Sequence, residues 1–108
     1  MSRALLLLAA VVIVAPFGAS AQTDQDGRAL FHAKCGMCHD AGGDGTGLLA
    51  RRVQPAELAK RSDLKVDYVF QYARRGLGNM PPITPGDVSD PQLRAIAAWL
   101  AAGPHEPR

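Results

Sequence analysis

The sequence predicts a small all-α domain, because three segments repeat apolar residues at helical spacing and no segment alternates them as a strand does. The length of 108 residues allows one such domain. Apolar residues make up 47% of the chain but are concentrated in the first 21 positions. The remaining chain can bury only a modest core, so we expect something other than side chains to help fill the interior.

The first 21 residues have the pattern of a secretory signal peptide. Arg3 is followed by an unbroken apolar run at 4–15, then Pro16 and the triplet Ala19-Ser20-Ala21. A basic start, a short apolar stretch and a small-residue cleavage site are typical of exported precursors. We predict cleavage after Ala21, which leaves a domain of residues 22–108 in the periplasm with no membrane span. An uncleaved membrane anchor is the alternative, although a spanning helix needs ~20 apolar residues.

The first predicted helix covers about 26–35 and ends at the cysteines of the chain. The second covers about 66–75, where apolar residues recur at i, i+3, i+4 and i+7 and Gly76 supplies a left-handed stop. Between them, residues 40–47 include four glycines. Such a stretch is either a flexible linker or a place where the backbone must pass close to another group.

The third helix has the clearest signals. Ser89 and Gln92 form a capping box with a proline in the first turn, and an apolar stripe follows as far as Gly103. Trp99 lies at the edge of this stripe, and we expect it to pack on the first helix near Gly27 and Phe31.

Both cysteines belong to one string, Cys35-Gly36-Met37-Cys38-His39. In an exported protein a disulfide or a redox pair is possible, but a bridge over two residues closes only a very small loop. A structural zinc site would need four ligands, and the chain has no second paired cluster. C-x-x-C-H is the attachment signature of a c-type haem. We therefore predict one covalent haem c, with thioether bonds from Cys35 and Cys38 and with the imidazole of His39 on the iron. In a haem protein, the glycine-rich stretch 40–47 is expected to let the backbone pass close to the edge of the ring.

Met80 is the best candidate for the sixth iron ligand. It lies in a loop with glycines before it and prolines after it, which is unusual for a methionine that only fills a core. Met37 is held between the attachment cysteines and cannot reach the other face of the ring. We expect His32 to be a surface residue and His105 to belong to a disordered tail. A histidine and a methionine ligand together favour an electron carrier, whereas an open position would allow gas or peroxide chemistry.

The order of helix, C-x-x-C-H, glycine-rich loop, helix, methionine loop and capped helix resembles the class I single-haem c-type cytochromes. Within that group, the strings 68–75, 78–81 and 88–90 are similar to the cytochrome subunit of p-cresol methylhydroxylase-type flavocytochromes. The resemblance implies a small class I cytochrome c fold, with three main helices around one covalent haem. It also implies His39 as the proximal ligand and Met80 as the distal ligand.

Two further positions follow from this resemblance. The arginine that usually neutralises a haem propionate corresponds to Arg51 or Arg52, and the sequence does not choose between them. A glycine-proline pair after the attachment motif often lends a carbonyl to the proximal histidine. Here Gly47 is followed by Leu48, so this carbonyl donor is not identified.

The function expected from these features is one-electron transfer without a substrate of its own. The subunit resemblance implies a flavoprotein partner, whose FAD oxidises a 4-alkylphenol, and a soluble acceptor that removes the electrons. A general periplasmic carrier for another dehydrogenase or oxidase is the alternative, and a haem peroxidase or gas sensor is a further one. The net charge of +2 argues against a nucleic-acid partner.

A docking surface for the redox partner is expected around the haem edge. Residues 51–75 carry seven basic and three acidic side chains, which favours electrostatic steering of a partner, although such a segment can also be an ordinary solvated face. The small and apolar groups expected at this surface are Ala41, Leu77, Pro81, Pro82 and Ile83.

Overall fold

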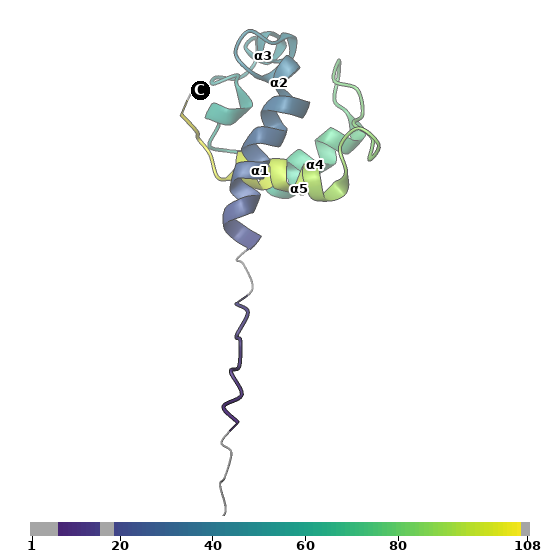
Figure 1. The fold of residues 1–108 in the computed structure, drawn as a ribbon. Coiled ribbons are helices and arrows are strands. Elements are labelled where there is room, and N and C mark those ends of the chain that lie inside the picture. The colour runs from purple at the N-terminus through teal and green to yellow at the C-terminus, as the bar shows by residue number, and fades with distance from the viewer. Residues whose placement is uncertain (1–6, 16–18, 107–108) are drawn as a thin grey trace, which may run out of the picture.

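In a computed structural model of the chain, residues 7–15 and 19–106 are described (Figure 1). They form helices and connecting turns, and this part of the chain contains no strand, only one isolated bridge between Leu77 and Met80. The predicted all-α class is therefore confirmed. In chain order the elements are α1 (Ala19–Lys34), α2 (Gly36–His39), α3 (Asp44–Leu49), the 3-10 turn η1 (Leu58–Lys60), α4 (Val66–Arg75) and α5 (Asp90–Ala101).

The three helices expected from apolar spacing are α1, α4 and α5. Helix α4 has the predicted bounds and ends at Gly76, whose φ of 75° only glycine adopts readily. Helix α5 begins with the predicted capping box, since the Ser89 hydroxyl accepts from the Gln92 amide and the Gln92 side chain accepts from the Ser89 amide. Helix α1 begins at Ala19 and not near residue 26, because nothing between these positions breaks a helix.

The expected leader is only partly described. Arg3, Pro16 and Gly18 lie outside the described residues, and the predicted cleavage after Ala21 falls in the first turn of α1. Residues 7–15 extend away from the helices (Figure 1). Their side chains, such as Leu8 and Ile13, are almost fully exposed. Among the helices that the structure describes, none has the length and apolarity to cross a membrane.

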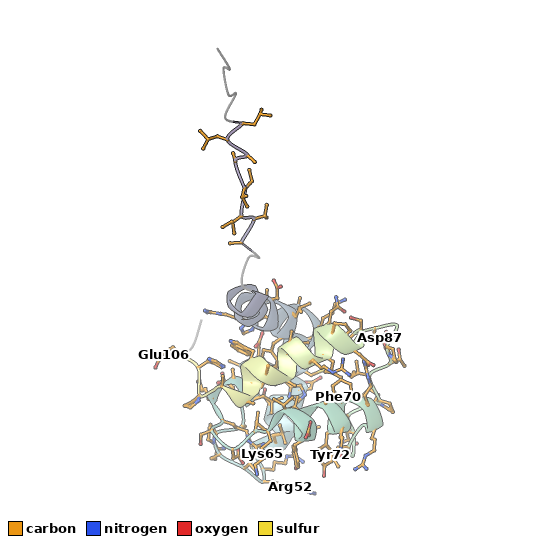
Figure 2. All side chains as sticks on the ribbon, turned by 90° about the horizontal axis from the view of Figure 1, so that it is seen from below. Arg52, Lys65, Phe70, Tyr72, Asp87 and Glu106 are labelled. Carbon is orange, nitrogen blue, oxygen red and sulfur yellow. The ribbon has the colours of Figure 1, made fainter. Side chains whose placement is uncertain are left out.

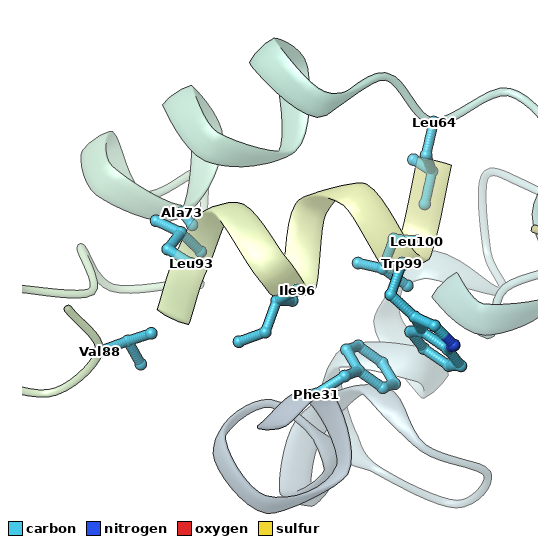
Figure 3. Packing of buried hydrophobic residues seen from close by; sticks show 8 residues of the cluster. All are labelled: Phe31, Leu64, Ala73, Val88, Leu93, Ile96, Trp99 and Leu100. Atoms are coloured by element: carbon cyan, nitrogen blue, oxygen red, sulfur yellow. The ribbon is translucent and has the colours of Figure 1, made fainter. Parts of the chain in front are cut away.

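Helices α1 and α5 cross at Gly27, where the two backbones come close together. A Cβ at this position would lie 2.5 Å from the Ala95 carbonyl oxygen and 2.7 Å from the Trp99 Cβ. One turn further along α1, the Phe31 ring packs against the Trp99 indole with centroids 5.3 Å apart (Figure 3). The predicted contact of Trp99 with Gly27 and Phe31 is thus confirmed.

The core is centred on α5, with α1 on one side and α4 on the other. Large apolar side chains from α5 fill the space between them, and the most deeply buried side chains are Phe31, Ile96 and Leu100. Figure 3 shows the eight residues of this cluster, which are Phe31, Leu64, Ala73, Val88, Leu93, Ile96, Trp99 and Leu100.

The C-terminal segment differs from the expectation. His105 was predicted to be disordered, but its ring stacks on the Trp99 indole with centroids 4.0 Å apart. Its amide also donates to the Ala59 carbonyl at 2.7 Å. The segment after α5 therefore folds back over the core, because a flat imidazole can cover the indole face that α1 leaves open.

Candidate functional site

The C-x-x-C-H string forms a tight turn that continues from α1 into α2. The Cys35 amide donates to the Phe31 carbonyl at 2.8 Å, and the His39 amide donates to the Cys35 carbonyl at 2.9 Å. The turn therefore keeps helical spacing, so the two thiols and the imidazole are held close together. Cys35 is half-buried against the core and Cys38 is exposed, and the two do not form a disulfide.

The Cys35 thiol is held in its neutral form. Burial raises its pKa from 9.0 to about 11, and the nearby Asp40 carboxylate and Cys38 add to the shift. A buried thiol of this kind is inert until its environment changes. Cys38, in contrast, is open to solvent.

His39 is poised as a neutral imidazole. Burial lowers its pKa, and the negative charge of Asp40 only partly opposes this effect. Its Nδ1 is buried and has no hydrogen-bond partner in the part of the chain that the structure describes. A neutral imidazole with its other nitrogen available is the form that binds a metal.

Gly43, just before α3, and Gly45, in the first turn of α3, let the backbone close over this turn. A Cβ on Gly43 would lie 2.5 Å from the Cys38 carbonyl oxygen, and one on Gly45 would lie 2.8 Å from the same oxygen. The Gly45 Cβ would also come within 3.2 Å of the His39 ring. The glycines thus let the backbone pass close to the attachment turn, whereas the expected approach to the edge of the haem ring stays a prediction. The second half of the stretch belongs to α3 and is not a loop.

His32 does not have the predicted surface position. Its Nδ1 lies 2.8 Å from one carboxylate oxygen of Asp40 and 3.0 Å from the other, and its side chain is only 13% exposed. The His32 ring also meets the edges of Phe31 and Trp99. The pair therefore ties the residue after the attachment motif back to α1, a contact between positions eight apart.

The Met80 loop joins α4 to α5 and is held by backbone hydrogen bonds. Leu77 and Met80 each donate to the carbonyl of the other, at 3.0 and 2.9 Å, and the Ile83 amide donates to the Ala73 carbonyl at 2.8 Å. Gly76 allows this turn, because a Cβ there would lie 2.6 Å from the Met80 carbonyl oxygen. Met80 is half-buried and packs against the same core cluster as Cys35.

A model of the family described as cytochrome C oxidase, cbb3-type, subunit III, matches residues 22–100. The match spans the attachment turn, the Met80 loop and all of the helical core up to Leu100. The chain belongs to this family. It is a cytochrome c domain, and its chemistry is haem-based electron transfer. No curated protein and no solved structure matches the chain.

The residues of this cytochrome c domain fit a haem c. The donor set of neutral imidazole and thioether is one that haem iron takes in electron-transfer cytochromes. The buried Nδ1 of His39 does not add to this fit, because a metal-bound imidazole usually donates its other N–H to a carbonyl or carboxylate, and Nδ1 has no such partner among the described residues. The assignment of the thioether bonds to Cys35 and Cys38, and of the axial positions to His39 and Met80, stays a prediction.

The two candidate propionate contacts, Arg51 and Arg52, both follow α3 and are both exposed. Their amides donate to the Leu48 and Leu49 carbonyls, so the backbone here continues the last turn of α3. Figure 2 shows Arg52 and Lys65 near the same edge of the molecule, and both are exposed. The geometry of the cytochrome c domain does not favour either arginine.

The residues expected at the docking surface have different degrees of exposure. Leu77 is 60% exposed, whereas Ile83 is half-buried and packs against the core. Ala41, Pro81 and Pro82 are exposed. Ile83 is therefore a structural residue of the loop. A docking surface that includes the other four residues stays a prediction.

Sequence reasoning missed two side chains that hold the site of the cytochrome. Asp40 follows the attachment motif directly, and this neighbouring position is the only feature of the sequence that connects Asp40 with the motif. Arg74 binds three groups around the Met80 loop, but an arginine in the last turn of a helix is ordinary because it complements the helix dipole. Only the fold brings these partners together.

Proposed function

We propose that this cytochrome c domain is a one-electron carrier whose haem is attached to Cys35 and Cys38 and whose axial ligands are His39 and Met80. When bound, the haem iron supplies one-electron chemistry by alternating between its ferrous and ferric states. The observation that carries the proposal is the position of Met80. Its loop is fixed by hydrogen bonds on both sides, and its side chain packs against the same core cluster as Cys35.

Each residue contributes something that an electron carrier needs. Burial keeps the His39 imidazole neutral, so that its nitrogen can bind metal. The thioether of Met80 is a poorer donor to ferric iron than a second imidazole, so it raises the reduction potential. The fixed backbone on both sides of Met80 keeps this ligand in place, which favours a carrier over a peroxidase or a gas sensor.

Carbon monoxide binding separates these functions. A carrier with a firmly held Met80 binds carbon monoxide weakly in its ferrous form and shows no peroxidase turnover. Rapid carbon monoxide binding by the wild-type protein, together with peroxide turnover, would instead identify a haem enzyme or sensor with a labile sixth ligand.

The partner of the carrier is a second redox protein. The family description names an oxidase subunit, which supports electron delivery to an oxidase. A flavoprotein subunit that oxidises 4-alkylphenols is the second candidate, supported by the similarity of the strings 68–75, 78–81 and 88–90. Co-purification with an FAD protein, and haem reduction on adding a 4-alkylphenol, would support the flavoprotein. Reoxidation of the reduced protein by a terminal oxidase, without any FAD subunit, would support the oxidase.

We also propose export to the periplasm with cleavage after Ala21. This is supported by the basic start and by the apolar side chains at 7–15, which lie in water without covering the core. The N-terminal sequence of the periplasmic protein should begin at Gln22. An intact N-terminus in the membrane fraction would instead support the uncleaved anchor.

A further inference from the structure

Arg74 connects the end of α4 to both sides of the segment that follows Met80. Its guanidinium donates to the Ile83 carbonyl and to the Val88 carbonyl, each at 2.9 Å, and to an Asp90 carboxylate oxygen at 2.6 Å. The group lies over the Phe70 ring, 5.3 Å from its centroid, and the side chain is only 17% exposed. One side chain thus binds both ends of the segment 83–88 and the first residue of α5.

These contacts complete a set of anchors around Met80. The backbone pair of Leu77 and Met80 fixes the first half of the loop, and the Ile83 amide binds the end of α4. Arg74 donates to the carbonyl of the same Ile83, so both the amide and the carbonyl of that residue are hydrogen-bonded to α4. Beyond Ile83, the hydrogen bonds of the loop around Thr84 and Asp87 are local, and therefore the bond from Arg74 to the Val88 carbonyl connects this later stretch to α4.

We propose that Arg74 is a positioning residue, which fixes the Met80 loop and so decides how firmly Met80 keeps the sixth position closed. This inference rests on the proposed function, in which Met80 is the axial ligand. When the loop is anchored, little conformational entropy is lost as Met80 binds the iron. When the loop is loose, each binding event must also order the loop, which weakens the bond to the iron. Loss of Arg74 should therefore favour external ligands that compete with Met80.

The carbonyl contacts carry this effect more than the ion pair does. Asp90 is 51% exposed, and such pairs contribute little in water. The two carbonyls need two donors in a fixed planar arrangement, which a guanidinium has and an ammonium lacks. Arg74→Lys keeps the charge but should no longer fix the Met80 loop. Asp90→Asn should leave the loop fixed.

The chain offers a matched control in the next residue. Arg75 carries the same charge in the same turn of α4 but is exposed and lies over the Tyr72 ring, 5.7 Å from its centroid. Arg75→Gln changes net charge and helix-end electrostatics as Arg74→Gln does, but it removes none of the hydrogen bonds that Arg74 makes to Ile83, Val88 and Asp90.

The experiment is a titration of the ferric holoproteins with imidazole, with haem content and far-ultraviolet circular dichroism as checks of folding. Because two charge-assisted hydrogen bonds are lost, we expect Arg74→Gln to bind imidazole about tenfold more tightly than wild type. We expect Arg74→Lys to shift in the same direction, and Arg75→Gln and Asp90→Asn to stay within about twofold of wild type. Amide hydrogen exchange at Met80 and Ile83 should also be faster in the two Arg74 variants only.

Equal imidazole affinities for Arg74→Gln and Arg75→Gln would overturn the proposal. If neither Arg74 variant folds with haem, Arg74 is a general folding residue and the specific role is wrong. If wild type and Met80→Ala bind imidazole equally well, Met80 is not the axial ligand and the proposed function is wrong. Amide exchange at Met80 and Ile83 then still shows whether Arg74 fixes the loop.

Discussion

The imidazole of His105 lies flat on the indole of Trp99, with ring planes inclined by only 2°. Nε2 of the same imidazole lies 2.6 Å from the Trp99 carbonyl oxygen, so it is placed to donate to it, and the Phe31 ring packs 5.3 Å from the indole. Trp99 is therefore enclosed by α1 and by the C-terminal segment. This arrangement makes the segment after α5 part of the packing that supports the site.

Removal of the His105 ring should destabilise the protein. His105→Ala loses a stacked aromatic contact and a hydrogen bond, and we expect the free energy of unfolding to fall by about 1 kcal/mol. Urea unfolding followed by tryptophan fluorescence measures this change. Glu106→Ala, at the exposed next position, is the control and should have no effect. If the two variants are equally stable, the stack contributes nothing.

Gly76 and Gly78 should differ in their tolerance of alanine. Both have a positive φ, but a Cβ on Gly76 would lie 2.6 Å from the Met80 carbonyl oxygen, whereas one on Gly78 would meet nothing within 4 Å. Gly78→Ala should cost about 1 kcal/mol from backbone strain alone. Gly76→Ala should cost about 3 kcal/mol or more, because the loop must also shift. Urea unfolding of both variants tests this, and similar losses would show that the contact with Met80 is unimportant.

Burial should make the Cys35 thiol of the haem-free chain slow to react with an alkylating reagent. With a pKa of about 11, Cys35 is almost entirely protonated at pH 8, and its alkylation should rise about tenfold per pH unit up to that value. Exposed Cys38 should be modified first. Mass spectrometry after timed iodoacetamide treatment measures both rates. Equal rates at pH 8 would show that Cys35 is not shielded.

The same pKa shift predicts how the stability of the haem-free chain depends on pH. Because the folded state holds the Cys35 proton more tightly than the unfolded state, this contribution is fully present below about pH 9. It is lost as the pH rises from 9 through about 11. Cys35→Ala should remove this part of the slope in urea unfolding. An unchanged slope would mean that another group causes it.

The contact between His32 and Asp40 should be measurable as a coupling. A double-mutant cycle of His32→Ala and Asp40→Ala isolates the pair from other effects of each substitution. Since the Asp40 side chain is 38% exposed, we expect a coupling free energy of only about 0.5 to 1 kcal/mol. Additive losses of stability in the cycle would mean that the two residues act independently.

The fold could be predicted from local patterns wherever such patterns dominate. The apolar period of α4 and the capping box of α5 are signals within a few residues, and both helices were placed correctly. The short helix α3 was missed because three of its first four residues are Asp, Gly and Gly, which favour turns. It forms because its N-terminus is pinned to the attachment turn, where the Thr46 hydroxyl donates to the Asp40 carbonyl at 2.8 Å.

The haem-binding residues could be predicted from the sequence, but the side chains that hold them in place could not. The C-x-x-C-H string and the lone loop methionine can be read directly, because haem attachment requires fixed residue types at fixed spacing. The positions of His32 and His105 were wrong because both depend on Trp99 or Asp40, which are distant in the chain or lie on another element. Arg74 has partners up to 16 residues away, and no local pattern predicts such a contact.

The ferric absorption spectrum of Met80→Ala shows whether Met80 binds the haem iron. Met37→Ala is the matched control, since Met37 is 91% exposed and lies between the attachment cysteines. We expect a far-red sulfur-to-iron band in wild type and in Met37→Ala, and its loss in Met80→Ala together with rapid binding of carbon monoxide by the ferrous form. A wild-type protein without this band, or a Met80→Ala variant that keeps it, would mean that Met80 is not the axial ligand.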